Sequence, residues 1–308
     1  MAEHDDQAAR ERADRVTASL LSHAESVVRD CEADALFVYL DALEDPHVVW
    51  PESLRDKVIT VTRTADEDRD QEQHHVRHIR VPNVSLSRVG QVKMALLLAM
   101  SRGLVEPDDT VVFLAGISGS GSLDTILVTT ISREHEMVRV PEDDTAPPLP
   151  VDPLVLERVI GIAVNLGSEG REGRPVGALF VLGDAERVLS LTRQIILNPV
   201  SGYPESRRNI LDPALHETIR EFASMDGAFV IRGDGVLMSA GTYLMTSAHA
   251  GEELPKGLGA RHHAAAGITA VSNAVAVAVS QSTGTVSVFR GGRLLTSIER
   301  PTSAGQAS

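Results

Sequence analysis

The sequence predicts an α/β protein with two domains. In both halves of the chain, short apolar runs rich in strand-forming residues alternate with longer segments of helical spacing. Residues 141–153 (PEDDTAPPLPVDP) interrupt this alternation with five prolines and four acids, a composition typical of an irregular linker. Because 308 residues suffice for about two domains, we expect domains at residues 1–145 and 146–300, followed by a flexible tail at 301–308.

Two helices and five strands are expected in the first half. Residues 8–30 place Val16, Leu20 and Val27 near helical spacing with charged residues between them. Residues 86–100 are apolar on all sides, as in a buried helix, and this helix should end near Gly103. The expected strands are short apolar or alternating runs at residues 35–40, 57–62, 76–81, 110–115 and 125–130.

The second half repeats the alternation. Helices are expected at residues 153–166, 212–224 and 261–272, and strands at 176–182, 227–231, 236–239, 274–279 and 285–289. Asp212 is a suitable N-cap for the middle helix because Pro213 follows it at the first helical position. The pair Asp234-Gly235 predicts a tight hairpin turn between two of the strands.

The composition restricts the class of protein. Asp and Glu number 43 against 29 Lys and Arg, which gives a net charge of −14, and only Lys57, Lys93 and Lys256 are lysines. Such a surface stays hydrated at high salt, so we expect a salt-adapted protein, and it argues against a nucleic-acid partner. No apolar run reaches the ~18 residues of a membrane helix. With one cysteine, Cys31, and no signal-like N-terminus, the chain is expected to be cytoplasmic and not associated with a membrane.

Three stretches of the second half carry candidate chemistry. They are residues 225–244 (MDGAFVIRGDGVLMSAGTYL), 259–268 (GARHHAAAGI) and 277–289 (VAVSQSTGTVSVF). Each motif is weak alone, but their order and spacing resemble the diadenylate cyclase (DAC) domain over about residues 152–300. The whole chain resembles the archaeal diadenylate cyclases of the DacZ type. The resemblance implies an N-terminal α/β domain like the C-terminal domain of pyruvate kinase, followed by a DAC domain with a mixed β-sheet flanked by helices.

The resemblance implies an enzyme. It would condense two ATP molecules into cyclic di-AMP and two pyrophosphates, with Mn²⁺ or Mg²⁺ on the phosphates. A ribose 3′-OH of one ATP attacks the α-phosphorus of the other, and this chemistry needs in-line positioning and charge neutralisation. Because each DAC domain holds one ATP, the partner is expected to be a second copy of the chain in a homo-oligomer with DAC domains face to face.

The same resemblance implies the catalytic residues Asp226, Arg261 and His262. Asp226 would bind the metal and help to deprotonate the hydroxyl, and a turn-capping aspartate is the alternative. Arg261 and His262 open a helix, where backbone N–H groups and a guanidinium favour phosphate. The remaining ATP contacts implied are Gly227, Ala228, Leu244, Gly259, Ala260, His263 and Ser280. Among these, Leu244 would face the adenine, unless it is an ordinary core leucine, and Ser280 would lie beside the phosphates.

Several positions depart from the family pattern. Ala260 replaces a common threonine, His263 replaces an arginine, and Gln281 and Ser282 replace acids that usually follow the serine. Loss of the acids removes a metal or water contact, and His263 could make activity depend on pH near neutrality. Replacement of the acids after Ser280 favours the alternative function, a non-catalytic sensor of ATP or cyclic di-AMP that has a degenerate cyclase fold. We nevertheless expect an active enzyme, because Asp226, Arg261 and His262 all remain.

Other features of the first half have two interpretations each. Residues 116–122 (GISGSGS) are a flexible turn or, as in pyruvate kinase-like domains, a loop for a phosphorylated effector. His74, His75 and His78 could bind a metal, but on a strand His75 and His78 face opposite sides. Residues 66–70 (DEDRD) lack the spacing of a calcium loop. In a third hypothesis, the first domain is the functional part of the protein and binds a sugar phosphate or an acid.

Overall fold

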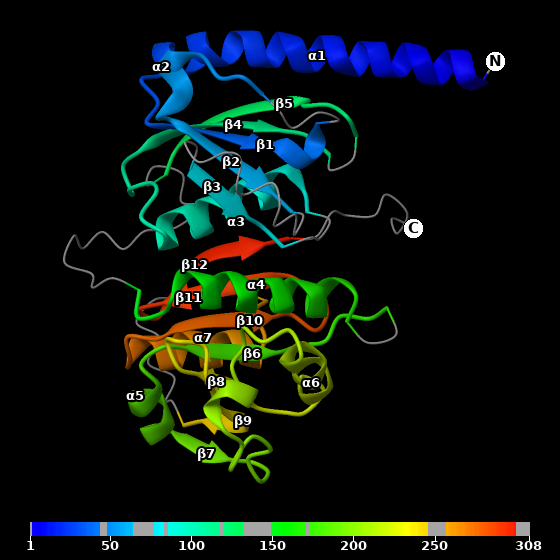
Figure 1. Ribbon diagram of the computed structural model, residues 1–308. Coiled ribbons are helices and arrows are strands. Elements are labelled where there is room, and N and C mark those ends of the chain that lie inside the picture. Colours follow the sequence, from blue (N-terminus) through cyan, green and yellow to red (C-terminus); the bar gives the residue numbers. More distant parts are fainter. Residues whose placement is uncertain are drawn as a thin grey trace. The chain divides into compact units, whose positions relative to one another are not determined.

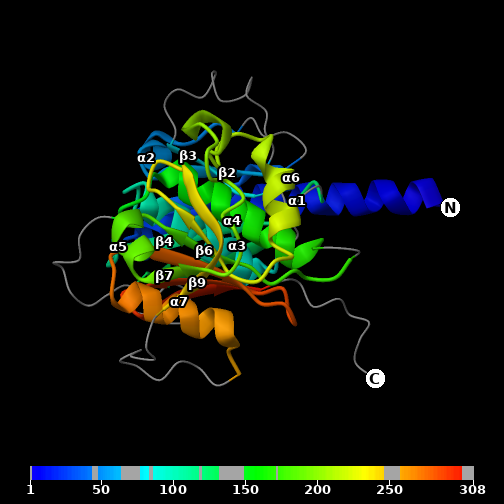
Figure 2. The same cartoon turned by 90° about the horizontal axis from the view of Figure 1, so that it is seen from below.

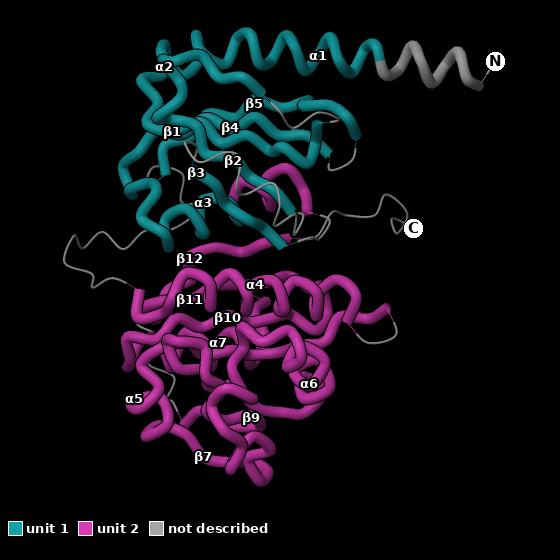
Figure 3. The backbone as a smooth tube through the Cα atoms, in the orientation of Figure 1, with its two compact units in different colours: residues 1–83, 94–140 teal, residues 84–93, 141–308 magenta. Residues whose placement is uncertain are grey.

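The structure is a computed structural model that describes residues 2–43, 48–63, 77–82, 86–117, 120–131, 149–170, 173–245 and 257–299, with side chains from residue 11 onward. His74, His75, residues 66–70, residues 141–148 of the linker and the tail at 301–308 lie outside these ranges. The predicted domain boundary at residue 145 also falls outside them. The chain divides into two units, residues 1–83 with 94–140 and residues 84–93 with 141–308 (Figure 3).

The first unit is built on a five-stranded sheet with the order β3-β2-β1-β4-β5 (Figure 1). The strands are β1 (Ala35–Tyr39), β2 (Val58–Thr62), β3 (Arg77–Arg80), β4 (Thr110–Ala115) and β5 (Thr125–Thr130). All neighbours are parallel except β4 and β5. Every residue of β1 is buried, which explains why this central strand is a continuous apolar run. Phe37 and Phe113 stack across β1 and β4 with ring centroids 4.5 Å apart.

Helices complete this unit. They are α1 (Ala2–Asp30), the 3₁₀ turn η1 (Leu40–Ala42), α2 (Glu52–Arg55) and α3 (Arg88–Ser101), whose first residues belong to the second unit. Ala24 and Val28 of α1 share one buried cluster with Leu36 and Leu114 of the sheet. His78 lies 3.0 Å from the hydroxyl of Thr60 and 3.2 Å from that of Thr62, so its ring faces β2.

The second unit contains a mixed seven-stranded sheet with the order β12-β11-β10-β6-β8-β9-β7. Its strands are β6 (Leu179–Leu182), β7 (Thr192–Gln194), β8 (Ala228–Ile231), β9 (Leu237–Leu244), β10 (Val275–Val279), β11 (Val286–Arg290) and β12 (Arg293–Ile298). Only β6 and β8 pair in parallel. The predicted mixed sheet and both predicted hairpins, β8–β9 and β10–β11, are therefore present.

Helices cover both faces of this sheet. They are α4 (Pro153–Ser168), α5 (Ala185–Ser190), the 3₁₀ turn η2 (Glu205–Arg207), α6 (Leu215–Phe222) and α7 (Ala260–Ala270). Figures 1 and 2 show α4 and α7 on opposite sides of the strands. Ala265 and Ala266 of α7 are fully buried against Ala276 and Ala278 of β10. Small side chains at both surfaces let this helix approach the sheet closely.

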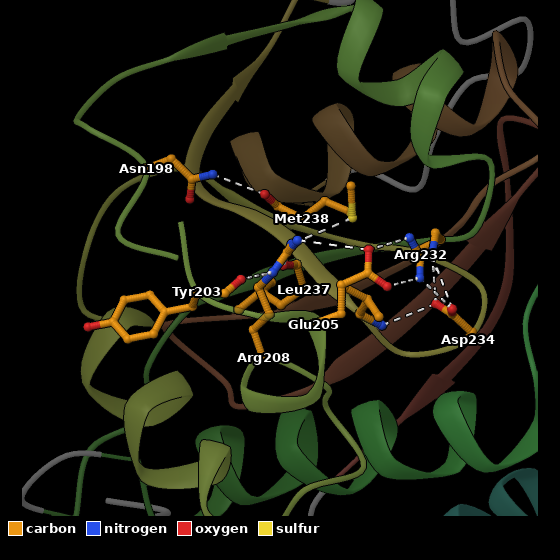
Figure 4. A network of polar contacts seen from close by, with 9 residues as sticks. Asn198, Tyr203, Glu205, Arg208, Arg232, Asp234, Leu237 and Met238 are labelled. Carbon is orange, nitrogen blue, oxygen red and sulfur yellow. Dashed lines mark hydrogen bonds and ion pairs between the residues drawn. The ribbon is translucent and has the colours of Figure 1, made fainter. Parts of the chain in front are cut away.

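A polar network fixes the long segment between β7 and α6 (Figure 4). Arg232 lies 2.7 Å from a carboxylate oxygen of Glu205 and 2.7 Å from one of Asp234, and its hydrogen bonds hold the pKa of both carboxyls below their usual range. Arg208 donates to the carbonyl of Leu237 at 2.7 Å, and Asn198 donates to that of Met238 at 3.0 Å. The segment is therefore attached to β9 by side-chain contacts to its backbone.

Some predicted elements need correction. The middle helix begins at Leu215, not at Asp212: the Asp212 side chain accepts from the N–H of Ala214 in a turn that precedes α6, so Asp212 is not the N-cap. The strand predicted at 176–182 begins only at Leu179, and β7, β12 and α5 were not predicted. In the part of the chain that the structure describes, no helix has the length and apolar character needed to cross a bilayer.

Candidate active site

Asp226 lies just before β8, in the turn that follows α6. The N–H of Met225 closes this turn by donating to the carbonyl of Phe222 at 3.0 Å. The Asp226 side chain is 94% exposed, so its carboxylate is available to a ligand. Ala228, two residues later, is the first residue of β8 and is buried in the core beneath the site.

The glycine after Asp226 is required by the sheet itself. Gly227 has φ +112°, and a Cβ there would lie 2.5 Å from the backbone nitrogen of Thr242 and 2.6 Å from the carbonyl carbon of Gly241. Neighbouring β9 is irregular at this point, because Ala228 pairs with Thr242 whereas Val230 pairs with Ser239. A side chain at residue 227 would therefore push β9 away and move Asp226, whether or not substrate approaches the same backbone.

Gln194 of β7 holds the irregular part of β9 in place. Its amide oxygen accepts from the hydroxyls of Ser239 and Thr242, each at 2.9 Å, and its amide nitrogen donates to the carbonyl of Ala240 at 3.0 Å. Ser239 and Thr242 are buried, so these contacts satisfy polar groups that would otherwise be costly to bury. The three hydrogen bonds connect the edge strand to the part of β9 against which Gly227 packs.

Arg261 comes from the first turn of α7 and points toward Asp226. Its Nη2 lies 3.8 Å from Oδ1 of Asp226, and its Nη1 donates to the amide oxygen of Gln281 at 3.4 Å. The helix begins at Ala260, and Gly259 is its N-cap; both residues are exposed. Glycine has no side chain that could accept a hydrogen bond from the amides of the first turn. The guanidinium and the positive end of the helix dipole thus lie side by side, an arrangement suited to phosphate.

The two histidines after Arg261 have different environments. His262 is only 5% exposed, and its ring makes an edge contact with Phe289, with centroids 6.1 Å apart. Among the described residues its Nδ1 is buried without a hydrogen-bond partner. Burial lowers the pKa of His262 below its usual value, and the charges of His263 and Arg261 lower it further. His262 is therefore neutral near pH 7 and lies under the helix, whereas His263 is exposed beside Arg261.

The other predicted contacts lie around this pair at different depths. Leu244 is buried in the core between the sheet and α7, as the alternative interpretation of that residue expected. Ser280 directly follows β10, and its hydroxyl lies 3.2 Å from that of Ser282 and accepts from the N–H of Thr283. The structure thus brings Asp226, Arg261 and the turn after Ser280 together, and leaves Leu244 and His262 in the interior.

Three residues near the site were not predicted as functional. Gln281 was considered only as a replaced acid, although it is the hydrogen-bond acceptor of Arg261. Gly177 packs against Arg261, and Gln194 supports the strand behind Gly227. A glycine next to an apolar strand indicates that another part of the chain packs closely against its backbone, but the sequence does not show which residue this is.

The donor set fits a metal ion that arrives with its nucleotide. Among the described residues no group of three or more His, Cys, Asp or Glu side chains could hold an ion by itself. Mg²⁺ and similar ions, however, are often bound by one or two carboxylates together with substrate phosphates. The exposed Asp226 carboxylate beside Arg261 supplies such a ligand next to the place expected for the phosphates.

Comparisons with known proteins identify the family of the chain. Residues 165–294 match the family described as "DisA bacterial checkpoint controller nucleotide-binding", and residues 17–138 match "Probable sensor domain DacZ_P". The diadenylate cyclase of Haloferax volcanii is 38% identical over 201 residues, which are 65% of this chain and 72% of that protein. The diadenylate cyclase of Methanocaldococcus jannaschii is 36% identical over 210 residues, which are 66% of this chain and 64% of that protein. The chain therefore belongs to the diadenylate cyclase family, as its motifs predicted.

Solved structures are similar over part of the chain. A hypothetical membrane spanning protein from Bacillus cereus is 21% identical with a TM-score of 0.35, covering 47% of this chain and 63% of its own. DacA from Staphylococcus aureus is 26% identical with a TM-score of 0.30, covering 46% of this chain and 84% of its own.

The N-terminal unit is assigned to the sensor family, and its likeness to pyruvate kinase stays a prediction.

Proposed function

We propose that Asp226 and Arg261 carry the formation of cyclic di-AMP from two ATP molecules in this enzyme. In each of two steps a ribose 3′-oxygen bonds to the α-phosphorus of the other ATP. The bond from that phosphorus to the bridging oxygen of pyrophosphate breaks, and the hydroxyl proton leaves. The observation that carries the proposal is the exposed carboxylate of Asp226 lying 3.8 Å from the guanidinium of Arg261 at the N-terminus of α7.

Arg261 and the start of α7 would neutralise the triphosphate. The guanidinium offers several donors in a planar fork, and the amides of the first turn add partial positive charge. His263, exposed on the same turn, can add a further hydrogen bond to the phosphates. Charge stabilisation of this kind lowers the barrier most when the donors are already in place before the reaction begins.

Asp226 would serve the attacking hydroxyl. Its carboxylate can accept the proton of the 3′-OH and can also hold Mn²⁺ or Mg²⁺, the ions proposed here for a metal-dependent family. A bound ion would supply charge neutralisation of the phosphates and an acidified hydroxyl.

The reaction requires two protomers. One site with one ATP offers a single 3′-OH and a single α-phosphorus, so ring closure needs a second site opposite the first. We propose a homo-oligomer in which the edges carrying Asp226 and Arg261 face each other across a two-fold axis. With a net charge of −14 per chain, such pairing would be favoured by salt and by cations bound with ATP.

The product assay tests this function. The protein is incubated with ATP and Mn²⁺ or Mg²⁺, and cyclic di-AMP is separated by chromatography. Asp226→Asn keeps the size of the side chain and should abolish product with an unchanged melting temperature, whereas Glu186→Gln, the same charge change on exposed α5, should leave product formation intact. Absence of product from the wild type, with ATP still bound, would support the sensor alternative instead.

We also propose a regulatory role for the N-terminal unit, with domain limits at residues 1–145 and 146–300 and a tail at 301–308. Its parallel sheet and its match to a sensor family support a pyruvate kinase C-terminal-like domain that responds to a ligand. Limited proteolysis of the full chain followed by mass spectrometry tests these limits. Cleavage should concentrate near residue 145, and cuts only within either half would contradict the boundary.

A further inference from the structure

A glycine outside the motifs lies directly against the catalytic arginine. Gly177 is buried just before β6, and a Cβ built on it would lie 2.7 Å from Nη1 and 3.0 Å from Cζ of Arg261. The same Cβ would lie 3.0 Å from the Cβ of Gln281. The guanidinium thus occupies the space that any other residue at position 177 would need for its own side chain.

The second contact of the guanidinium is Gln281, which lies on a well-supported turn. The turn between β10 and β11 is closed by two backbone hydrogen bonds of 2.9 Å, from Ser280 to Thr285 and from Gly284 to Ser280. Helix α4 packs so closely against this turn that a Cβ on Gly167 would lie 2.2 Å from the carbonyl oxygen of Gly284. Gln281 is therefore presented from a backbone that has little room to shift.

These contacts fix the direction of a flexible side chain. Arginine loses rotamer entropy when it is immobilised, and a site that has already ordered it does not lose this entropy on binding substrate. Asp226 alone restrains Arg261 weakly, because their atoms are 3.8 Å apart and the carboxylate is 94% exposed. Gly177 below and Gln281 beside the guanidinium provide the remaining restraint.

We propose that Gly177 and Gln281 are positioning residues that hold the Arg261 guanidinium in the orientation needed for the ATP phosphates. This inference rests on the proposed role of Arg261. The uncharged amide of Gln281 orients the arginine through a hydrogen bond and adds no carboxylate to that of Asp226, which lies 3.8 Å from the guanidinium. A second carboxylate at this place would compete further with the triphosphate for the charge of Arg261.

The variant Gly177→Ala should change the position of the Arg261 side chain without changing the fold. The φ of Gly177 lies outside the left-handed region, so alanine fits the backbone there. The closest atom is the end of a long side chain, so Arg261 should move while the strand stays in place. A displacement of about 1 Å at a catalytic group can lower turnover by as much as 10²-fold, and we expect a loss on the order of 10-fold in kcat/KM.

A double-mutant cycle tests the inference on the full chain with ATP and Mn²⁺. ATP affinity is measured by calorimetry, and product formation by chromatography, for the wild type, Gly177→Ala, Gln281→Ala, Arg261→Ala and the two doubles that include Arg261→Ala. Each positioning variant should weaken ATP binding in the wild-type background and change nothing further once Arg261 is alanine. Melting temperatures should stay within about 2 °C of the matching parent, because neither variant is expected to disturb the packing of the core.

The outcomes distinguish the proposed role of Arg261 from the positioning role of Gly177 and Gln281. If Arg261→Ala binds ATP and turns over like the wild type, the proposed role of Arg261 is wrong. If Arg261→Ala is impaired but Gly177→Ala behaves like the wild type, only the positioning role is wrong. Additive losses in the double variants, or an unfolded Gly177→Ala protein, would show that Gly177 acts through packing of β6 and would also overturn the inference.

Discussion

Gly227→Ala should destabilise the second unit strongly, and the structure allows the magnitude to be estimated. A non-glycine residue held at φ +112° costs about 1–3 kcal/mol. The added methyl would also lie 2.5 Å from the nitrogen of Thr242 and 2.6 Å from the carbonyl carbon of Gly241, and overpacking against such a backbone costs about another 1–3 kcal/mol. The sum, about 2–6 kcal/mol, is a large part of a typical domain stability of 5–15 kcal/mol.

The matched control is Gly202→Ala. Gly202 has φ +83° but no atom within 4 Å of its Cβ position, so this variant carries the backbone strain without the clash. Both variants are compared with the wild type by scanning calorimetry, following the transition of the second unit. Gly227→Ala should melt lower than Gly202→Ala by an amount on the order of 5 °C, at 2–4 °C per kcal/mol. Equal melting temperatures for the two variants would refute the argument that β9 leaves no room beside Gly227.

Three further predictions concern stability. Because burial lowers the pKa of His262 below 6.5, the unfolded chain takes up the proton first, so stability should be complete above about pH 6.5 and fall as the pH drops below it. His262→Gln should flatten this slope below about pH 6.5 in thermal melts, and an unchanged slope would contradict the assignment. Gln194→Ala should cost about 1–3 kcal/mol in urea unfolding, because it leaves the buried hydroxyls of Ser239 and Thr242 with one acceptor fewer. An unchanged free energy of unfolding would contradict the supporting role of Gln194. With a net charge of −14, the wild type should melt higher in molar KCl than in dilute buffer, and the highest melting temperature without salt would contradict salt adaptation.

The site could be predicted only in part. The resemblance to the DAC domain, carried by the DGA and RHH motifs, implied roles for Asp226 and Arg261, and the structure brings these two residues together. Sequence gave no indication that His262 would be buried while His263 is exposed, because a helix with few large side chains shows little periodicity. It also gave no sign that Gln281 would bind Arg261, since that contact depends on where a turn between two strands ends.

The sequence by itself determined whether each buried element is a helix or a strand. Continuous apolar runs such as β1 and β10 are recognisable because both faces of these strands are covered. Edge strand β7 has two exposed residues out of three, and it is held by pairing with β9, so it carries no apolar pattern. The positions of Gly177 and Gln194 against the site were likewise decided only by the tertiary structure. Their contacts join segments far apart in the chain, and a local pattern of apolar and polar residues records whether a position is buried, not which residue it will meet.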